Sequence, residues 1–396
     1  MEERYLLYMN FDGFADYYYT GSEDRFPALT ALIKESVRFT SCYSSIPSIT
    51  VPMQCAIVSG TTSAKTHNCF KYYDRSNGQV VFCKRRVDAE TVAESFAKNG
   101  KTVLSIQQFA VENHGCTRTD KDHLYIQPEK DFAHRFDILL DYFRNCKVPS
   151  FEFTSYRNAV LFYIDDLDSD GHNHHAPFAR TEEERVEKVS SKLELIDKRL
   201  ATLISLLKEL GLYEKTTILL TSDHGMVGFD TPSYKERLVN DLTSITGLKV
   251  TTDVEKAEEN DFLIIGDTIQ AQVYFMSEEA RKASLKAPIK ALDYVEEVLT
   301  RQDLDDRGVA KEYADLLISP KAGISFFAPS ALPSGIRFAS HDSLTEEAQH
   351  VFALIHDPNV EPKVISEKIS IIDLIPTCLS LLGCPKLKDA NGEVRL

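Results

Sequence analysis

The sequence has no apolar run long enough to cross a lipid bilayer, which takes about 20 consecutive residues. It also lacks an excess of basic residues, since 45 Lys and Arg stand against 60 Asp and Glu and give a net charge of −15. Proteins that bind long nucleic acids usually carry a basic face, so that class of function is disfavoured. A small anionic substrate is still compatible with this charge, because bound metal ions can reverse the local sign.

None of the eight cysteines occurs in the Cys-x-x-Cys spacing of many zinc and redox motifs. Several lie in apolar surroundings, which predicts the reduced thiols that are usual in cytosolic proteins. The opening residues, Met1–Tyr5, lack the basic region and apolar stretch of a secretory signal peptide. We therefore expect a cytoplasmic protein that does not act at a membrane.

The chain of 396 residues is long enough for one large core with an insertion, or for two domains. Apolar strands alternate with amphipathic helices, which predicts an α/β fold with a mostly parallel central sheet and helices on both faces. Thr181 and Glu184 form a capping-box pattern at the start of the longest expected helix. The main expected strands are 5–11, 102–106, 159–165, 216–221 and 351–355, and the main expected helices are 88–99, 131–146, 181–211 and 370–382.

The pattern changes between residues 227 and 339, where short strands and helices replace the regular alternation. This predicts a smaller α+β cap, inserted into a core that consists of residues 1–226 and 340–396. The expected cap elements are a hairpin of 261–265 with 270–276, a helix over 287–301, and strands at 316–319 and 324–328.

Three of the expected core strands lead into residues of the kinds that bind metals. The first leads to Asp12, the second to Asp168 and His172, and the third to Asp223 and His224. The carboxyl ends of parallel strands lie at one edge of a sheet, so we expect these side chains to meet. Each aspartate-histidine pair alone also fits an ordinary turn, and the prediction therefore depends on their combination.

A later histidine, His341, supplies the last expected ligand. We prefer it to His350 because it follows a loop rich in glycine and proline and precedes a polar turn. Three aspartates and three histidines suit two zinc-type ions about 4 Å apart, although manganese accepts the same ligands. We expect the neighbouring His174 and His175 to be solvated loop residues.

A hydroxyl-rich turn between Pro47 and Pro52 precedes a short apolar helix expected over 54–59. Thr50 in this turn is the candidate nucleophile, and Ser48 is the second candidate. Metal coordination can activate such a hydroxyl without a separate general base. Taken alone, Thr50 also fits the simpler role of a helix N-cap.

The order of these motifs resembles that of the alkaline phosphatase superfamily, and within it the nucleotide pyrophosphatase/phosphodiesterase branch, over nearly the whole chain. The motifs that carry the resemblance are Asp12-Gly, Pro-Ser-Ile-Thr50-Val-Pro, Asp168-Ser-Asp-Gly-His172, Ser-Asp223-His224-Gly, His341 and Asp373-Leu-Ile-Pro-Thr. The resemblance implies the alkaline phosphatase-like fold with a cap. It also implies one metal ion held by Asp168, His172 and His341, and another held by Asp12, Asp223, His224 and Thr50.

The chain departs from that branch at the substrate-binding positions. Val51 and Met53 stand where the branch commonly has phenylalanine and asparagine. The resemblance implies that Tyr163 stacks on a nucleobase and that Asn68 is a candidate donor to a phosphate oxygen. The sulfatase branch is disfavoured, because Thr50 cannot become its formylglycine and its arginine is missing.

We therefore expect a two-metal hydrolase that cleaves phosphodiester or pyrophosphate-type bonds through a phospho-Thr50 intermediate. Its expected partner is a small phosphate ester, nucleotide-like in character, rather than a long nucleic acid. One alternative is a phosphomonoester or phosphonate hydrolase on the same scaffold. Another is a non-catalytic, metal-stabilised binding protein, which would be marked by a missing ligand or nucleophile. The sequence leaves the oligomeric state open.

Overall fold

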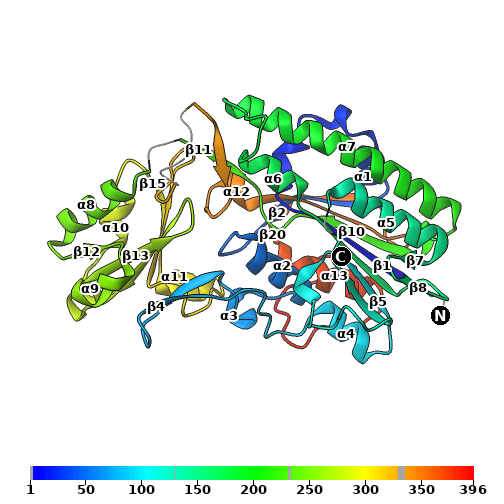
Figure 1. Ribbon diagram of the computed structural model, residues 1–396, viewed down its shortest axis with the longest axis horizontal. Helices are drawn as coiled ribbons and strands as arrows, with labels where there is room; N and C mark the ends of the chain where they lie inside the picture. Colours follow the sequence, from blue (N-terminus) through cyan, green and yellow to red (C-terminus); the bar gives the residue numbers. More distant parts are fainter. Residues whose placement is uncertain (1–2, 129, 231–232, 329–334) are drawn as a thin grey trace.

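A computed structural model of the chain describes residues 3–128, 130–230, 233–328 and 335–396. Its centre is a nine-stranded sheet in the order β19-β2-β18-β10-β1-β9-β5-β6, with β20 paired to β2 (Figure 1). The strands are β1 (Tyr5–Phe11), β2 (Val37–Tyr43), β5 (Val103–Ile106), β6 (His123–Ile126), β9 (Ala159–Ile164), β10 (Thr216–Thr221), β18 (His350–His356), β19 (Lys363–Ile365) and β20 (Ile369–Ser370).

The strands that matter for the site are parallel neighbours. β1 lies between β10 and β9, and both pairings are parallel, as are those of β9 with β5 and of β5 with β6. β18 alone among the paired strands of this sheet is antiparallel to both of its neighbours, β10 and β2. The predicted α/β class with a mostly parallel sheet is confirmed.

Helices cover both faces of the sheet (Figure 1). The alternation of side chains along β1 explains this, because Leu7, Met9 and Phe11 pack on one face while Leu6 and Tyr8 pack on the other. The first face is covered by α1 (Pro27–Lys34), α5 (Phe132–Asn145) and α7 (Glu182–Glu209), and the second by α2 (Thr50–Ser59), α4 (Val92–Lys98) and α13 (Leu374–Leu381).

The start of α7 differs from its prediction in one contact. Thr181 accepts a hydrogen bond from the backbone N–H of Glu184, as a capping box requires. The Glu184 carboxylate, however, accepts from the N–H of Arg180 instead of that of Thr181. Complete capping boxes include the one at α4, where Thr91 and Glu94 bond to each other's backbone, and the one formed by Thr300 and Asp303.

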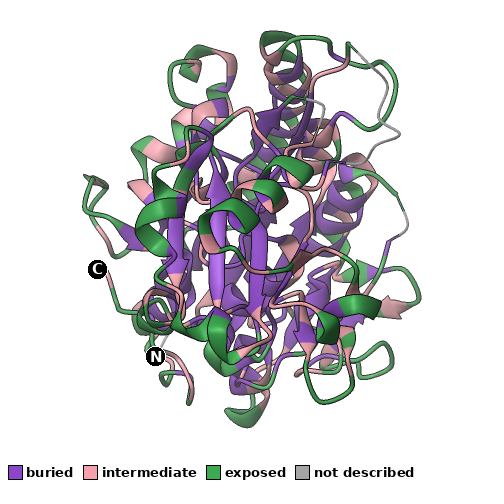
Figure 2. Cartoon of the chain, turned by 90° about the vertical axis from the view of Figure 1, so that its left-hand side faces the viewer, coloured by how far each residue is buried: buried purple, intermediate pink, exposed green. Residues whose placement is uncertain are grey.

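A second sheet stands apart from the first, in the order β12-β13-β14-β16-β15, and has its own apolar core. We call this sheet and the helices around it the cap (Figures 1 and 2). Its strands are β12 (Val250–Thr251), β13 (Phe262–Gly266), β14 (Ala271–Phe275), β15 (Val295–Thr300) and β16 (Leu316–Pro320), and its helices are α8 (Lys235–Thr246), α9 (Glu278–Lys282), α10 (Lys286–Lys290) and α11 (Arg301–Asp306).

The expected hairpin of the cap is present as β13 and β14, but two other expectations are wrong. Residues 287–301 are not one helix, because Val295–Thr300 pairs with β16 and buries Val295, Val298 and Leu299. Sheet pairing here outweighs helix propensity. Residues 324–328 lie outside the described strands, and Phe326 instead donates its N–H to the carbonyl of Ile269 over 3.1 Å.

Two small elements connect the core with the cap. A ribbon of β11 (Val227–Phe229) and β17 (Phe338–Ser340) leads into and out of it. A hairpin of β3 (Lys71–Asp74) and β4 (Gln79–Phe82) lies beside the cap, where Tyr73 donates its N–H to the Tyr274 hydroxyl over 3.1 Å. The domain boundaries at 226/227 and 339/340 remain a prediction, and part of the adjoining glycine- and proline-rich loop, 329–334, lies outside the described residues.

The remaining elements are short. They are β7 (Lys147–Val148), β8 (Phe151–Glu152), α3 (Ser63–Thr66), α6 (Asp166–His172), α12 (Glu346–Gln349) and 3-10 turns at Asp16–Tyr18, Glu23–Arg25, Phe109–Val111, Tyr213–Lys215, Val254–Glu259 and Ile371–Asp373. Within the described ranges, no helix combines the length and the apolar character needed to cross a membrane.

Candidate metal centre

The carboxyl ends of three adjacent strands bring the predicted ligands together. Asp12 directly follows β1, and Asp223 and His224 follow β10 after one residue. Asp168 and His172 lie on α6, which starts two residues after β9. The predicted convergence at one sheet edge therefore holds for all five side chains.

The first ligand group surrounds His224. Its Nε2 atom lies 3.2 Å from Asp12 Oδ1 and 3.6 Å from Asp223 Oδ2. All three side chains are buried. Thr50 is the first residue of α2, and its Oγ1 lies 3.1 Å from the same His224 Nε2. Ile49 is the N-cap, so the simpler interpretation of Thr50 as a helix cap is wrong.

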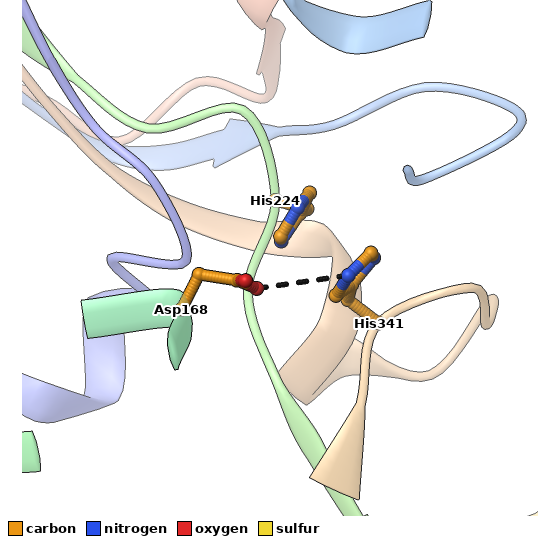
Figure 3. A group of neighbouring side chains, drawn as sticks. All are labelled: Asp168, His224 and His341. Carbon is orange, nitrogen blue, oxygen red and sulfur yellow. Dashed lines mark ion pairs between the residues drawn. The ribbon is translucent and has the colours of Figure 1, made fainter. Parts of the chain in front are cut away.

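The second ligand group surrounds Asp168. Its Oδ1 atom lies 3.4 Å from His172 Nε2. The same oxygen lies 3.6 Å from His341 Nε2 (Figure 3). His341 directly follows β17, far from α6 in sequence. The preference for His341 over His350 agrees with this geometry, because His350 Nε2 is 3.0 Å from the carbonyl oxygen of Thr40 on the central sheet.

The two groups meet where the rings of His224 and His341 stack, with centroids 3.6 Å apart (Figure 3). As a result, the ligand atoms of Asp168, His224 and His341 lie within 4.8 Å of one another, as do those of Asp12, Asp223 and His224. The division implied by the resemblance assigns His224 to one ion alone. In this structure His224 is shared between both groups.

Backbone carbonyls fix the orientation of all three histidines. The Nδ1 atoms lie within 3.0 Å of carbonyl oxygens, with His172 on Ala339, His341 on Ser48 and His224 on Gly225. Donation from Nδ1–H leaves Nε2 as the unprotonated nitrogen that faces the carboxylates. This is the outer-shell arrangement that usually orients metal-binding imidazoles.

The carboxylates have oxygen atoms that fit a cation. Asp12 Oδ1, Asp168 Oδ1 and Asp223 Oδ2 are buried and have no hydrogen-bond partner within the described chain. An unsatisfied buried carboxylate oxygen is costly, and a metal ion can balance it. Three such atoms facing three imidazole nitrogens fit two divalent metal ions.

The local charges give the same conclusion. Burial, together with the charges of Asp223 and Asp168, raises the pKa of Asp12 well above its usual range. Burial also acts to raise the pKa of Asp168, but its interactions with the imidazoles of His172 and His341 outweigh burial and lower that pKa. Cationic charge is thus what this cluster of carboxylates needs, and bound metal ions would supply it.

The two predicted substrate-binding residues lie elsewhere than expected. Tyr163 is buried in the core, and its hydroxyl donates a hydrogen bond to Asp12. Its ring lies edge-on to Phe109, with centroids 5.4 Å apart. A nucleobase cannot stack on a covered ring, so the structure corrects the role of Tyr163 to holding a ligand carboxylate.

Asn68 is fully buried and bonded within its own loop. Its amide nitrogen donates to the carbonyls of Lys84 and Arg86, and its oxygen accepts from the N–H of Phe70. These contacts use both donors and the acceptor of the amide. The prediction that Asn68 binds a phosphate oxygen is therefore wrong.

Ser48, the second candidate nucleophile, has its hydroxyl near other groups than the metal ligands' side chains. Its hydroxyl lies 3.2 Å from the carbonyl of Ala348 and 3.4 Å from the hydroxyl of Ser44. Among the loop histidines, His174 is exposed as expected, and its ring stacks on that of His172 with centroids 5.1 Å apart.

Two positioning residues were missed from the sequence. Asp342 is buried and accepts hydrogen bonds from the N–H groups of Thr268 and Ile269, so it ties the cap to the residue next to His341. Arg185 on α7 is also completely buried. The only sequence signal for Asp342 was its place directly after a candidate ligand.

Comparison with known proteins agrees with this site and fold. The family model described as type I phosphodiesterase / nucleotide pyrophosphatase matches residues 6–343. A curated relative, bis(5'-adenosyl)-triphosphatase ENPP4 from Bos taurus, is 25% identical over 245 residues, which are 59% of this chain and 49% of the relative. The chain thus matches about half the length of that relative.

Solved structures of similar fold include murine ectonucleotide pyrophosphatase/phosphodiesterase 5, with 15% identity and a TM-score of 0.71 over 98% of this chain and 97% of that one. The human counterpart has 17% identity and a TM-score of 0.69, again over 98% and 97%. An inactive threonine-to-alanine variant of the murine protein in complex with AMP has 15% identity and a TM-score of 0.70, over 99% and 98%. The resemblance inferred from the motifs is confirmed, and the chain belongs to the type I phosphodiesterase / nucleotide pyrophosphatase family.

Proposed function

We propose that this chain is a two-metal hydrolase that cleaves phosphodiester or pyrophosphate-type bonds of a nucleotide-like small molecule, with Thr50 as nucleophile. The observation that carries the proposal is the position of Thr50 Oγ1, 3.1 Å from His224 Nε2 at the start of α2. Two relatives support the substrate class, since one is named for an adenosyl triphosphate and another was solved with AMP. The latter is inactive when a threonine is replaced by alanine.

Two sets of residues would hold the metal ions. Asp168, His172 and His341 form one set, and Asp12, Asp223, His224 and Thr50 form the other, with His224 close enough to serve either. Zinc suits this mixture of carboxylates and imidazoles best, and manganese is the alternative. When bound, the ions would neutralise charge on the phosphoryl oxygens and on the attacking and leaving oxygens.

The chain itself supplies the nucleophile and part of the binding site for the phosphoryl group. Thr50 Oγ1 attacks phosphorus, so that an O–P bond forms while the ester bond to the leaving group breaks. Water then cleaves the phospho-Thr50 bond and restores the hydroxyl. Because Thr50 opens a helix, the N-terminal end of α2 favours the negative charge of the bound phosphoryl group.

Replacing Thr50 with Ala tests the assigned role. We expect diester hydrolysis to fall by about 10³-fold or more, as for loss of other nucleophiles, while the metal content stays unchanged. Thr50→Ser is the matched control, because it keeps the hydroxyl and should keep measurable activity. Undiminished turnover by the alanine variant would contradict the proposal.

The choice of substrate decides between the proposed reaction and its alternative. Hydrolysis of bis-p-nitrophenyl phosphate is expected to exceed that of p-nitrophenyl phosphate, because a diesterase must accommodate an organic group where a monoesterase places charge. The reverse preference would favour a phosphomonoesterase or phosphonate hydrolase on the same scaffold.

We also propose a cytoplasmic location, although the solved neighbours are named ectonucleotide enzymes. The support is that all eight cysteines are free thiols in the structure, as expected in a reducing compartment. Fractionation of cells that express the untagged protein would test the location, and recovery in the medium or at the cell surface would contradict it.

A further inference from the structure

Two cysteines meet at the base of the β3–β4 hairpin. The Sγ atoms of Cys69 and Cys83 lie 3.9 Å apart. All eight cysteines belong to the described parts of the chain, and this is the pair whose sulfur atoms contact each other. A disulfide needs a sulfur separation near 2.0 Å, so side-chain rotation would have to shorten the gap by about 2 Å.

The hairpin backbone holds the two cysteines in place. β3 and β4 pair with Lys71 opposite Phe82, so Cys69 and Cys83 lie just beyond the same end of this ladder, on its two different strands. The N–H of Cys83 extends the pairing by donating to the carbonyl of Phe70 over 2.8 Å. Phe70 itself has a φ of +69°, a left-handed conformation that turns the chain directly after Cys69.

The two thiols are not equivalent. Cys69 is buried, whereas Cys83 is partly exposed. A hydrogen bond from the Cys69 thiol, helped by the charge of Arg86, lowers the pKa of Cys83 to about 7 against the opposing effect of burial. Because the thiolate is the reactive form, Cys83 is the attacking sulfur and Cys69 is placed to react second.

This hairpin also contacts the cap through two ion pairs. Lys71 Nζ lies 3.2 Å from Asp267 Oδ1 in the turn between β13 and β14, and Arg75 forms an ion pair with Asp315. The residue after Asp267, Thr268, donates its N–H to Asp342, which is the neighbour of His341. A change at the base of the hairpin therefore acts on a segment that contacts both the cap and, through it, the metal centre.

We propose that Cys69 and Cys83 form a reversible dithiol–disulfide site that closes the base of the β3–β4 hairpin. The oxidant is a small-molecule disulfide such as oxidised glutathione. The Cys83 thiolate attacks one sulfur of the oxidant, which releases one thiol and leaves a mixed disulfide on Cys83. Cys69, on losing its proton, then attacks the Cys83 sulfur and releases the second thiol. Two protein thiols are oxidised while one disulfide is reduced to two thiols.

The full-length reduced protein, treated with oxidised glutathione, alkylated and mapped by mass spectrometry, tests the proposal. We expect the loss of two hydrogens, the loss of two alkylatable thiols and one cross-link between Cys69 and Cys83. Dithiothreitol should restore both thiols. The initial reaction at pH 7 should be at least about tenfold faster at Cys83 than at Cys146, a partly exposed cysteine whose pKa is raised by burial.

Three variants give distinct expected results. Cys69→Ser should retain glutathione on Cys83, because the second thiol is missing. Cys83→Ser should leave Cys69 unmodified, since Cys69 is buried. Cys146→Ser should form the cross-link as the wild type does.

Hydrogen exchange of the wild-type protein provides a readout that needs no variant. Amide exchange within residues 70–82 should slow by severalfold after oxidation, because the Cys69–Cys83 disulfide opposes opening of the hairpin. A glutathione adduct that persists on wild-type Cys83 beside a free Cys69 would overturn the proposal. So would a cross-link between another pair, or modification of Cys146 without any reaction at Cys83.

Discussion

At the scale of single residues, the metal centre depends on side chains that touch no ligand position themselves. Arg185 is the clearest example. Its guanidinium donates to the hydroxyls of Tyr18 and Tyr17 over 2.8 and 3.1 Å, and it lies 3.4 Å from the carbonyl of Gly171, next to His172. Tyr17 in turn donates to the carbonyl of Met226, two residues after His224. One arginine thus supports segments from both ligand groups.

Replacing Arg185 with Met should destabilise the protein by about 2–3 kcal/mol, because a buried, hydrogen-bonded charge is lost. This loss of stability is smaller than is usual for breaking a buried ion pair, because the partner, Glu182, is 37% exposed and can be solvated. Arg199→Met is the matched control on the same helix. Its ion pair with Asp137 is exposed, so we expect a change below about 1 kcal/mol. Urea denaturation of both variants measures the difference, and equal midpoints would contradict this assignment.

At the scale of elements, the end of β1 must approach α6 closely for the two ligand groups to meet. Gly13 makes this possible, with a φ of +72°. A Cβ atom at this position would lie 2.9 Å from the Cα atom of Asp168. Only glycine combines that conformation with that space.

Gly13→Ala should therefore displace α6 and cost more than backbone strain alone, about 2–4 kcal/mol with weakened metal binding. Gly211→Ala is the control, because its φ of +66° is similar but its Cβ would meet no atom within 4 Å. We expect about 1 kcal/mol there. Thermal unfolding and metal titration of the two variants compare them, and similar losses in both would rule out the steric explanation.

A second element, α11 in the cap, is stabilised by the negative charge of Asp303 in its first turn. Hydrogen bonds from Lys286 and Thr300 lower the pKa of Asp303 to about 2. A carboxylate with a lowered folded pKa contributes stability above its unfolded pKa, near 4, and loses it as the pH falls toward 2. Above pH 4, the free energy of unfolding of Asp303→Asn should therefore be about 1 kcal/mol lower than that of wild type. This difference between the two proteins should become smaller as the pH falls toward 2.

Chemical denaturation of wild type and Asp303→Asn across this pH range provides the test. Asp305→Asn, on the same short helix, is the control for a change in net charge. A gap between wild type and Asp303→Asn that is constant with pH would contradict the assigned role of the charge.

At the scale of the whole molecule, the metal centre lies where core and cap meet. The core supplies Asp12, Asp168, Asp223 and Thr50, while His341 follows the ribbon of β11 and β17. Asp342 then fastens the cap to that segment. The cap is therefore connected directly to the segment that carries His341.

The features that the sequence predicted well are local. Asp12 directly follows β1, and Asp223 and His224 follow β10 after one residue. The parallel pairing of these two strands is enough to bring the three side chains together. Thr50 was recognisable from its hydroxyl-rich turn, but its contact with His224 connects residues far apart in the chain.

The failures depend on tertiary contacts. Tyr163 lies on β9 as expected, but its hydroxyl donates a hydrogen bond to Asp12, and its ring is not available to a nucleobase. Asn68 is bonded to carbonyls in a loop whose course no motif reveals. The stretch 287–301 has helical character locally, but pairing with β16 makes its middle a strand. The stacking of His224 on His341 also depends on the ribbon of β11 and β17, because His341 directly follows β17.

The central claim is tested most directly by metal content and diester hydrolysis, measured together for wild type, Asp223→Asn and the exposed control Asp137→Asn. We predict two divalent ions per chain and hydrolysis of bis-p-nitrophenyl phosphate in wild type and control. Asp223→Asn should lose metal and at least about 10²-fold in activity, since a buried ligand carboxylate becomes neutral. Full activity of that variant, or a wild type that binds neither zinc nor manganese and hydrolyses nothing, would contradict the account.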